Sequence, residues 1–276
     1  MKLATIRLAD GRTEAARVDG EHAVLLGHAD VGALLRDGGD ALDRAAAAEG
    51  TAVPLADADL APVVPAPGKI LCVGLNYRAH ILEMGRELPA FPTLFAKYPE
   101  ALVGPRDGIR LPPETDRLDW EGELAVVVGR AVRRAGPQEA RAAVAGYAVL
   151  NDVTARDWQY RGPQWLQGKT FEATTPFGPV LVTPDEWEPG PDLVTAVDGE
   201  EVQRASTADL VFGPAELVAY ASTILTLRPG DVIATGTPGG VGHARKPARY
   251  LSDGQSLTTT VEGLGTLANP VRAERR

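Results

Sequence analysis

Two glutamates open an apolar segment, DWEGELAVVVGR, at residues 119–130. Ala125 to Val128 is a largely β-branched run that predicts a strand. Because side chains alternate along a strand, Glu121 and Glu123 would share a face with Ala125 and Val127. A face that continues into apolar residues favours inward-pointing glutamates, and two glutamates at this spacing can converge on one ion. Solvated glutamates at the mouth of a strand remain the alternative interpretation.

A third carboxylate, Asp152, closes the apolar segment GYAVLN and begins NDVTARDWQ. Together with Glu121 and Glu123 it would supply three hard oxygen ligands. Such a set suits Mg²⁺, Mn²⁺ or Ca²⁺ and leaves coordination positions for water or substrate. Asp152 follows Asn151 and is equally compatible with a turn or helix-capping residue. The spacing alone leaves both interpretations open.

His80 and Glu83 lie three residues apart in GLNYRAHILEMG. If this segment forms a helical turn, the two side chains share a face and Glu83 can orient and charge-stabilise the imidazole. A histidine held in this way can take a proton from water or substrate near neutral pH. An exposed surface turn would show the same spacing.

Further cationic and donor groups follow the carboxylates along the chain. Arg156 and Gln159 fall four and seven positions after Asp152, where a helix would place them beside whatever Asp152 binds. Lys169 lies in a glycine-flanked loop and is a candidate cation for an anionic group. Ordinary surface salt bridges would also account for these residues.

The loop ATGTPGGVG, residues 234–242, is dense in glycine, and its backbone N–H groups could bind an oxyanion. It lacks the Gly-Lys-Ser/Thr ending of a P-loop and the G-x-G-x-x-G spacing of a dinucleotide site.

The elements that must position these residues are mostly strands. Apolar runs predict strands at residues 70–74, 124–128, 147–151, 179–182, 231–235 and 255–261, and helices at 137–143 and 213–222, the second continuing to 227. The order does not follow regular β-α-β alternation, so we expect a mixed α/β, mostly β fold.

The first 65 residues have a different pattern. Short strands fit residues 2–8, 13–18 and 22–26, and an alanine-rich helix fits 31–49. The proline-rich segment 61–69 is typical of a linker. The sequence therefore predicts a small α+β domain over 1–65, followed by a catalytic domain over 66–276.

Composition narrows the possible partners and compartment. The chain has 276 residues, with 28 Lys and Arg against 37 Asp and Glu. This acidic balance, without a basic run, argues against nucleic acid and anionic membranes as partners. No apolar run reaches the ~18 residues of a membrane helix, and the N-terminus lacks the apolar core of a signal peptide. We therefore expect a cytoplasmic protein.

Cysteine and histidine are scarce. The single cysteine, Cys72, excludes an intramolecular disulfide, suits a reducing compartment and is expected to be buried in a strand. With four histidines, the chain also has too few ligands for a zinc ribbon. Any metal must rely mainly on oxygen ligands.

Taken together, the motifs resemble the fumarylacetoacetate hydrolase family from about residue 69 to 271. GLNYRAHILEMG, LDWEGELAVVVGR, NDVTARDWQ, QGKTFEATTPFGP and TGTPGGVG occur in the family's order. The resemblance implies a β-roll catalytic domain with a small N-terminal domain, usually a homodimer. It also implies a divalent metal, commonly Mg²⁺, with Mn²⁺ or Ca²⁺ as alternatives.

The resemblance assigns roles residue by residue. The implied metal ligands are Glu121, Glu123 and Asp152. The implied catalytic residues are His80 and Glu83, on a lid-like segment, and Lys169; the implied substrate-binding residues are Arg156, Gln159 and Thr237.

Members of this family act on small oxo acids in several ways. The implied function is hydrolytic or decarboxylative C–C cleavage in 2-oxo or β-diketo acids, such as acylpyruvates, fumarylacetoacetate or oxaloacetate. The alternative is an isomerase of the 2-hydroxyhepta-2,4-diene-1,7-dioate type. A binding module with structural Ca²⁺ would leave Lys169, His80 and Glu83 without a role. We expect the variable part of the substrate to contact an apolar wall formed by Phe91, Leu94, Phe95 and Tyr98.

Overall fold

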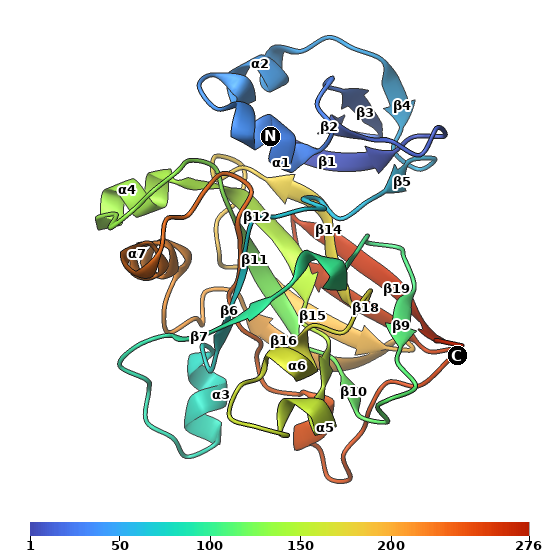
Figure 1. Cartoon of the computed structure of the whole chain (residues 1–276), viewed down its shortest axis with the longest axis vertical. Coiled ribbons are helices and arrows are strands. Elements are labelled where there is room, and N and C mark those ends of the chain that lie inside the picture. The colour runs from blue at the N-terminus through green and yellow to red at the C-terminus, as the bar shows by residue number, and fades with distance from the viewer. Residues whose placement is uncertain (276) are drawn as a thin grey trace.

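The computed structural model describes residues 1–275, which form a mixed α/β, mostly β fold (Figure 1). One sheet has twelve strands: β1 (Lys2–Arg7), β2 (Thr13–Asp19), β3 (His22–Leu25), β4 (Ala52–Pro54), β5 (Asp59–Leu60), β6 (Ile70–Gly74), β7 (Thr93–Lys97), β8 (Leu102–Val103), β11 (Gly122–Val128), β12 (Val144–Asn151), β14 (Thr175–Val182) and β17 (Val232–Ala234). The main path runs β4-β3-β2-β1-β14-β12-β11-β17-β6-β7, with β5 beside β1 and β8 beside β14.

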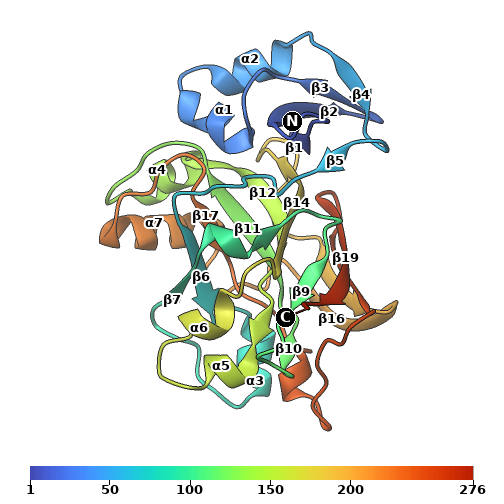
Figure 2. The same ribbon diagram turned by 45° about the vertical axis from the view of Figure 1, so that its right-hand side comes forward.

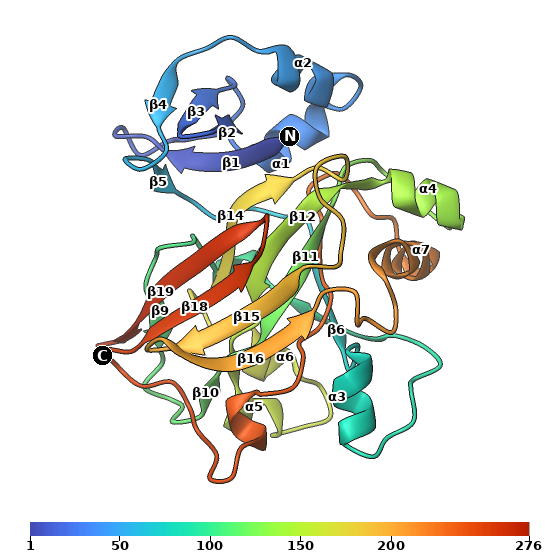
Figure 3. The same ribbon diagram turned by 180° about the vertical axis from the view of Figure 1, so that it is seen from behind.

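A second sheet contains five strands and covers one face of the first (Figure 3). Its order is β16-β15-β18-β19-β9, formed by β9 (Ile109–Leu111), β15 (Asp192–Val197), β16 (Glu200–Ser206), β18 (Ser256–Val261) and β19 (Gly265–Ala273). The strands β10 (Leu118–Asp119) and β13 (Thr154–Ala155) form a separate antiparallel pair.

Seven α-helices lie around the sheets within the described residues: α1 (Val31–Asp37), α2 (Ala41–Ala47), α3 (Arg78–Glu83), α4 (Pro137–Ala142), α5 (Arg156–Gln159), α6 (Leu166–Lys169) and α7 (Pro214–Ile224). Two 3-10 turns, η1 (Pro99–Ala101) and η2 (Gly242–Ala244), complete the elements. No helix among residues 1–275 is long and apolar enough to cross a membrane.

The N-terminal strands are continuous with the large sheet. Lys2 lies opposite Val182 and Leu3 opposite Leu181, so β1 pairs with β14. The predicted linker is not an exposed tether, because Val63 is fully buried. The division of the chain at residue 65 stays a prediction, with these contacts joining its two sides.

The single helix predicted at 31–49 was wrong. The chain leaves α1 at Gly38 and Gly39, whose φ angles of 66° and 55° lie in the left-handed region, and α2 starts at Ala41. An α-helix requires negative φ at every residue, so the two glycines divide the segment.

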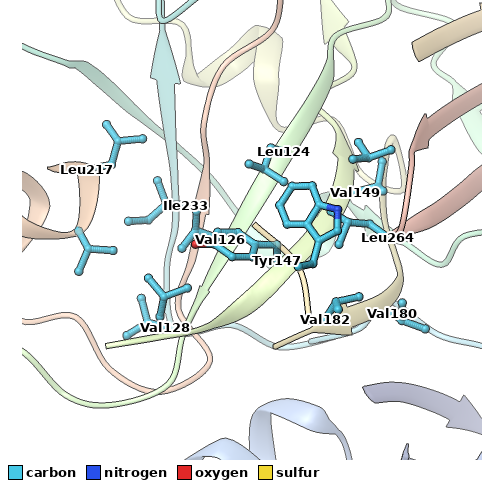
Figure 4. Close-up of a cluster of buried hydrophobic side chains, with 14 of the residues drawn as sticks. Leu124, Val126, Val128, Tyr147, Val149, Val180, Val182, Leu217, Ile233 and Leu264 are labelled. Carbon is cyan, nitrogen blue, oxygen red and sulfur yellow. The ribbon is translucent and has the colours of Figure 1, made fainter. Parts of the chain in front are cut away.

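The central strand β11 is buried on both faces. Leu124, Val126 and Val128 belong to one apolar cluster, which includes Leu264 from the loop before β19 (Figure 4). Ala125 and Val127 belong to a second cluster, on the side covered by the N-terminal helices α1 and α2. A strand between two apolar layers leaves its polar residues only at its ends.

Strand pairing brings several of these ends to one edge. Gly122 at the start of β11 lies opposite Asn151 at the end of β12, and Ala234 at the end of β17 lies beside Cys72 of β6. The helices α3, α5 and α6 gather at the same end of the molecule, away from the N-terminal strands (Figure 2). The polar residues that follow these strands therefore meet beneath three short helices.

Candidate metal centre and active site

Three carboxylates meet where β11 begins and β12 ends. The backbone N–H of Asp152 donates to the carbonyl of Glu121 at 2.7 Å, which fixes the two strand ends together. One carboxylate oxygen from each of Glu121, Glu123 and Asp152 lies within 4.8 Å of the other two. All three residues are buried, so the solvated interpretation of the glutamates was wrong.

The donor set fits a hard divalent cation. Three buried carboxylates in such proximity repel one another, and Mg²⁺, Mn²⁺ and Ca²⁺ all prefer oxygen ligands. Burial, together with the neighbouring Asp152 and Glu121, raises the pKa of Glu123 well above its usual value. Glu123 accepts one backbone hydrogen bond, from the N–H of Gly236 at 2.8 Å. A bound cation would supply the positive charge that the Glu123 carboxylate needs.

Two buried lysines hold the Asp152 carboxylate. Lys169 Nζ donates to Asp152 Oδ2 at 2.7 Å and to Glu121 Oε2 at 2.6 Å. Lys97 Nζ donates to the other oxygen of Asp152 at 2.6 Å and to the carbonyl of Val153 at 3.2 Å. Burial by itself would raise the pKa of Asp152, but the two lysines outweigh burial and hold that pKa below its usual value. Asp152 is therefore ionised and fixed in orientation.

Lys169 reaches this position because α6 packs closely on α5. A Cβ placed on Gly168 would lie 2.4 Å from the backbone nitrogen of Gln159, a distance that real Cβ atoms do not show. Only glycine permits this approach, which puts the next residue, Lys169, over the carboxylates.

Arg156 bridges Glu121, one of the three grouped carboxylates, and a fourth acid, Asp119. Its Nε donates to Asp119 Oδ2 at 2.8 Å, and its Nη1 lies 2.6 Å from Glu121 Oε1 and donates to Gln159 Oε1 at 3.0 Å. Asp119 also accepts the backbone N–H groups of Gly242 at 2.7 Å and His243 at 2.9 Å. As predicted, Arg156 and Gln159 lie on a short helix beside Asp152. Their substrate-binding role stays a prediction.

The glycine-rich loop binds protein carboxylates. The N–H groups of Gly236 and Gly242 donate to Glu123 and Asp119, so neither is available for a substrate oxyanion. Thr237 Oγ1 donates to the carbonyl of Gly122 and accepts from Gln203 Nε2, both at 2.9 Å. Thr237 is near the carboxylates, and its contact with substrate stays a prediction.

His80 and Glu83 lie on α3 and face the glycine-rich loop. A Cβ added to Gly239 would lie 3.0 Å from His80 Nδ1 and 3.6 Å from Glu83 Oε2. His80 is half-buried and Glu83 is exposed. Burial lowers the pKa of His80 below 6.5, although Glu83 and Glu121 partly oppose this shift. The imidazole is therefore neutral near pH 7 and able to accept a proton.

A cavity of about 350 Å³ lies between α3 and the carboxylate cluster, and of the three carboxylates only Glu121 lines it. Its polar lining includes His80, Glu121, Arg156, Gln159, Lys169 and Thr237, and its apolar lining includes Val73, Met84, Phe95, Trp165 and Val241. Among the four residues of the predicted apolar wall, only Phe95 lines the cavity. Phe91 instead stacks on Tyr220 with ring centroids 6.4 Å apart. The volume is that of a small-molecule site.

Sequence reasoning missed two residues of this centre. Lys97 closes a short apolar strand, and its only sequence signal is a charge at a position where strand alternation would place it inward. Asp119 precedes the two glutamates by two residues, so strand alternation places it on their face, but nothing in the sequence pairs it with Arg156. Both contacts join residues 37 or more positions apart, so local spacing does not reveal them.

The fold and the site define a known class of enzyme. The fumarylacetoacetate (FAA) hydrolase C-terminal family matches residues 69–272, so the chain belongs to this family and is an enzyme. The solved fumarylacetoacetate hydrolase of Exiguobacterium antarcticum is 36% identical, with a TM-score of 0.89 over 99% of this chain and all of that chain. The 2-hydroxyhepta-2,4-diene-1,7-dioate isomerase of Mycobacterium marinum is 33% identical, with a TM-score of 0.81 over the full length of both chains.

Curated relatives carry a further name. The mitochondrial oxaloacetate tautomerases Fahd2a of Rattus norvegicus and FAHD2A of Homo sapiens are each 43% identical to this chain. Each match covers 83% of this chain and 74% of the relative.

Proposed function

We propose that this enzyme forms and protonates the enolate of a 2-oxo acid, with oxaloacetate as the representative substrate and a divalent cation as cofactor. The observation that carries the proposal is the cavity lined by Glu121, Lys169 and a neutral His80, with Glu123 and Asp152 grouped behind Glu121. An enolate needs positive charge at its oxygen and a proton donor or acceptor at its carbon, and this cavity offers both.

The residues divide this chemistry between them. A cation bound by Glu121, Glu123 and Asp152 would supply Lewis-acid stabilisation of the oxo group. Lys169, within 2.7 Å of two of these carboxylates, adds a fixed positive charge at the same place. His80 takes or returns the carbon-bound proton as a neutral imidazole, and Glu83 stabilises the imidazolium that forms.

Proton transfer alone would make the enzyme a tautomerase. In the enol-to-keto direction, the enol hydroxyl would lose its proton and His80 would deliver a proton to C3. The mass of the substrate would not change. The 43% identity to proteins named oxaloacetate tautomerases favours this outcome. Unlike hydrolysis, this outcome requires no bound water molecule.

C–C cleavage is the second candidate. In a hydrolysis, His80 would take a proton from water, the hydroxide would add to the distal carbonyl, and the C–C electron pair would leave as the enolate. In a decarboxylation, the electrons of the breaking C–C bond would form the enolate as CO₂ leaves. The 36% identity to a solved fumarylacetoacetate hydrolase favours this candidate.

A substrate panel separates the candidates. The purified protein with Mg²⁺ is incubated with oxaloacetate, acylpyruvates of increasing chain length and a 2-hydroxydienedioate, and products are identified by mass. We expect enol–keto conversion of oxaloacetate above the protein-free rate, and release of CO₂ or a second acid would show cleavage. Inactivity on every 2-oxo and diketo acid tested would contradict the proposal.

We also propose Mg²⁺ as the cation and a homodimer as the assembly. The three oxygen ligands support a hard cation, and the homodimer rests on the family resemblance. Loading with single metals, followed by activity measurement, tests the first proposal. A native mass of twice 29.1 kDa would support the second, and a monomer mass would contradict it.

A further inference from the structure

Arg86 lines the active-site cavity from the segment that follows α3. Its positive charge also lowers the pKa of His80, which lines the same cavity. Among residues 1–275, Arg86 has no carboxylate within 4.0 Å. Arg86 is exposed to solvent.

The other cations that line the cavity are already paired. Arg156 lies between Asp119 and Glu121, and Lys169 lies between Glu121 and Asp152, each contact at 2.8 Å or less. His243 also lines the cavity, but burial and the nearby Arg156 lower its pKa, so it is uncharged near pH 7. Arg86 is thus the cation of this cavity, within the described part of the chain, that keeps its charge available.

The net charge of the buried centre, with a divalent cation bound, can be neutralised by one substrate carboxylate. Four carboxylates (Asp119, Glu121, Glu123 and Asp152) face three fixed cations (Lys97, Arg156 and Lys169). With all four carboxylates ionised, a divalent cation would change this balance from one excess negative charge to one excess positive charge. The carboxylate beside the oxo group of a 2-oxo acid would match that charge. A second carboxylate on the same substrate would need a different cation.

We infer that Arg86 binds the distal carboxylate of a dicarboxylic 2-oxo acid and makes the enzyme selective for dicarboxylates over monocarboxylates of equal length. The inference rests on the proposed function, because it assumes that the 2-oxo acid end lies at the buried carboxylates. Arginine suits this task, since its planar guanidinium can donate two parallel hydrogen bonds to one carboxylate. The cavity volume accommodates a short dicarboxylate between the two ends.

Two matched probe molecules isolate the distal carboxylate. 2-Oxoglutarate and 2-oxopentanoate have the same chain length and the same 2-oxo acid end, and differ in a terminal carboxylate against a methyl group. Their binding to the Mg²⁺-loaded protein is measured by calorimetry for wild type, Arg86→Gln, Arg86→Lys and Arg78→Gln. Arg78 is the control, because it is an exposed arginine of α3 that does not line the cavity.

We expect wild type to bind 2-oxoglutarate at least about tenfold more tightly than 2-oxopentanoate, as a charge-assisted hydrogen bond would give. Arg86→Gln should remove this difference and leave 2-oxopentanoate binding unchanged. Arg86→Lys should keep part of it, and Arg78→Gln all of it.

Three results would overturn the inference. Equal binding of both probes by wild type, or equal weakening of both by Arg86→Gln, would overturn the role of Arg86 while leaving the proposed function standing. Binding of neither probe by wild type would overturn the proposed function together with the inference. Because Arg86 is exposed, the variant is expected to fold, and a thermal melt checks this.

Discussion

Lys97 and Asp152 form an ion pair in which both side chains are fully buried, with Nζ 2.6 Å from Oδ1. The lysine comes from β7 at one side of the site and the aspartate from the end of β12, separated by 55 residues. Since Lys169 holds the other oxygen of Asp152, neither oxygen can turn away without losing a charge partner. The pair therefore fixes the third carboxylate of the candidate metal centre.

Replacing Lys97 with Met should destabilise the protein by about 3 kcal/mol, because it leaves part of a buried negative charge uncompensated. Saturating Mg²⁺ should recover some of that loss, since the cation binds the folded state and neutralises the same carboxylate. The free energy of unfolding of Lys97→Met is measured in denaturant with and without Mg²⁺. Lys246→Met, at an exposed position, is the control. If Mg²⁺ does not reduce the destabilisation of Lys97→Met, Lys97 does not compensate the charge of a metal-binding Asp152.

Glu123→Gln should separate metal binding from folding. Burial and two neighbouring carboxylates disfavour the charge of Glu123, so the neutral amide should leave the metal-free protein as stable as wild type or more stable. Loss of residues that only orient metal ligands already costs about 10–100-fold in affinity or activity, so loss of a ligand should cost at least about 100-fold. Calorimetric titration with Mg²⁺ and a melting curve on the same sample test both. Wild-type Mg²⁺ affinity in the variant would remove Glu123 from the ligand set.

His80→Ala should lower the rate of tautomerisation by roughly 10²–10⁴-fold, the usual contribution of general acid–base catalysis. Mg²⁺ affinity should stay unchanged, because His80 is not among the grouped carboxylates. His22→Ala, at an exposed histidine of β3, is the control for loss of an imidazole elsewhere. An unchanged rate on every accepted substrate would show that His80 takes no part in proton transfer.

The pH dependence follows from the environment of His80. Burial and the nearby Arg86 hold the pKa of His80 below its ordinary 6.5, whereas Glu83 and Glu121 act in the opposite direction. The neutral imidazole is the proton acceptor, so kcat/KM should reach a plateau on the alkaline side of the His80 pKa and fall as the pH drops through that pKa.

The direction of the pKa shift in Glu83→Gln tests whether His80 is the group that causes the fall of kcat/KM at low pH. This substitution removes a charge that raises the pKa of His80, so the acid limb of the kcat/KM profile should move to lower pH. Glu87→Gln, at an exposed acid four residues further along the chain, should leave the limb in place. A shift of the limb to higher pH in Glu83→Gln would contradict the assignment of that limb to His80.

The sequence revealed those parts of the fold and site that local patterns determine. The strand predicted at 70–74 has the same bounds in the structure, because its apolar run is uninterrupted and Gly74 ends it. The spacing of Glu121 and Glu123 was also compatible with two glutamates that converge, and Asp152 lies close to both from the end of the neighbouring strand, while the role of all three as metal ligands stays a prediction. Each of these features depends on residues within one element or its end.

Long-range pairing accounts for what was missed. Strands β15 and β16 were not predicted, because polar residues such as Thr195 and Gln203 interrupt their apolar pattern. Both residues are buried, and Gln203 accepts the backbone N–H of Gly122 from the other sheet. The contact between Arg156 and Asp119 depends in the same way on the pairing of β10 with β13. Neither relationship is visible in the spacing of one segment.

The most direct test of the proposed chemistry is the enol-to-keto conversion of oxaloacetate, followed by ultraviolet absorbance, with chelator-treated protein before and after Mg²⁺ is added. Mg²⁺ alone and Glu123→Gln with Mg²⁺ are the controls. The proposal predicts that treated wild type matches the protein-free rate and that Mg²⁺ raises it well above both controls. A wild-type rate that survives chelation, or that Glu123→Gln reproduces with Mg²⁺, would contradict a metal-dependent enolate site at these carboxylates.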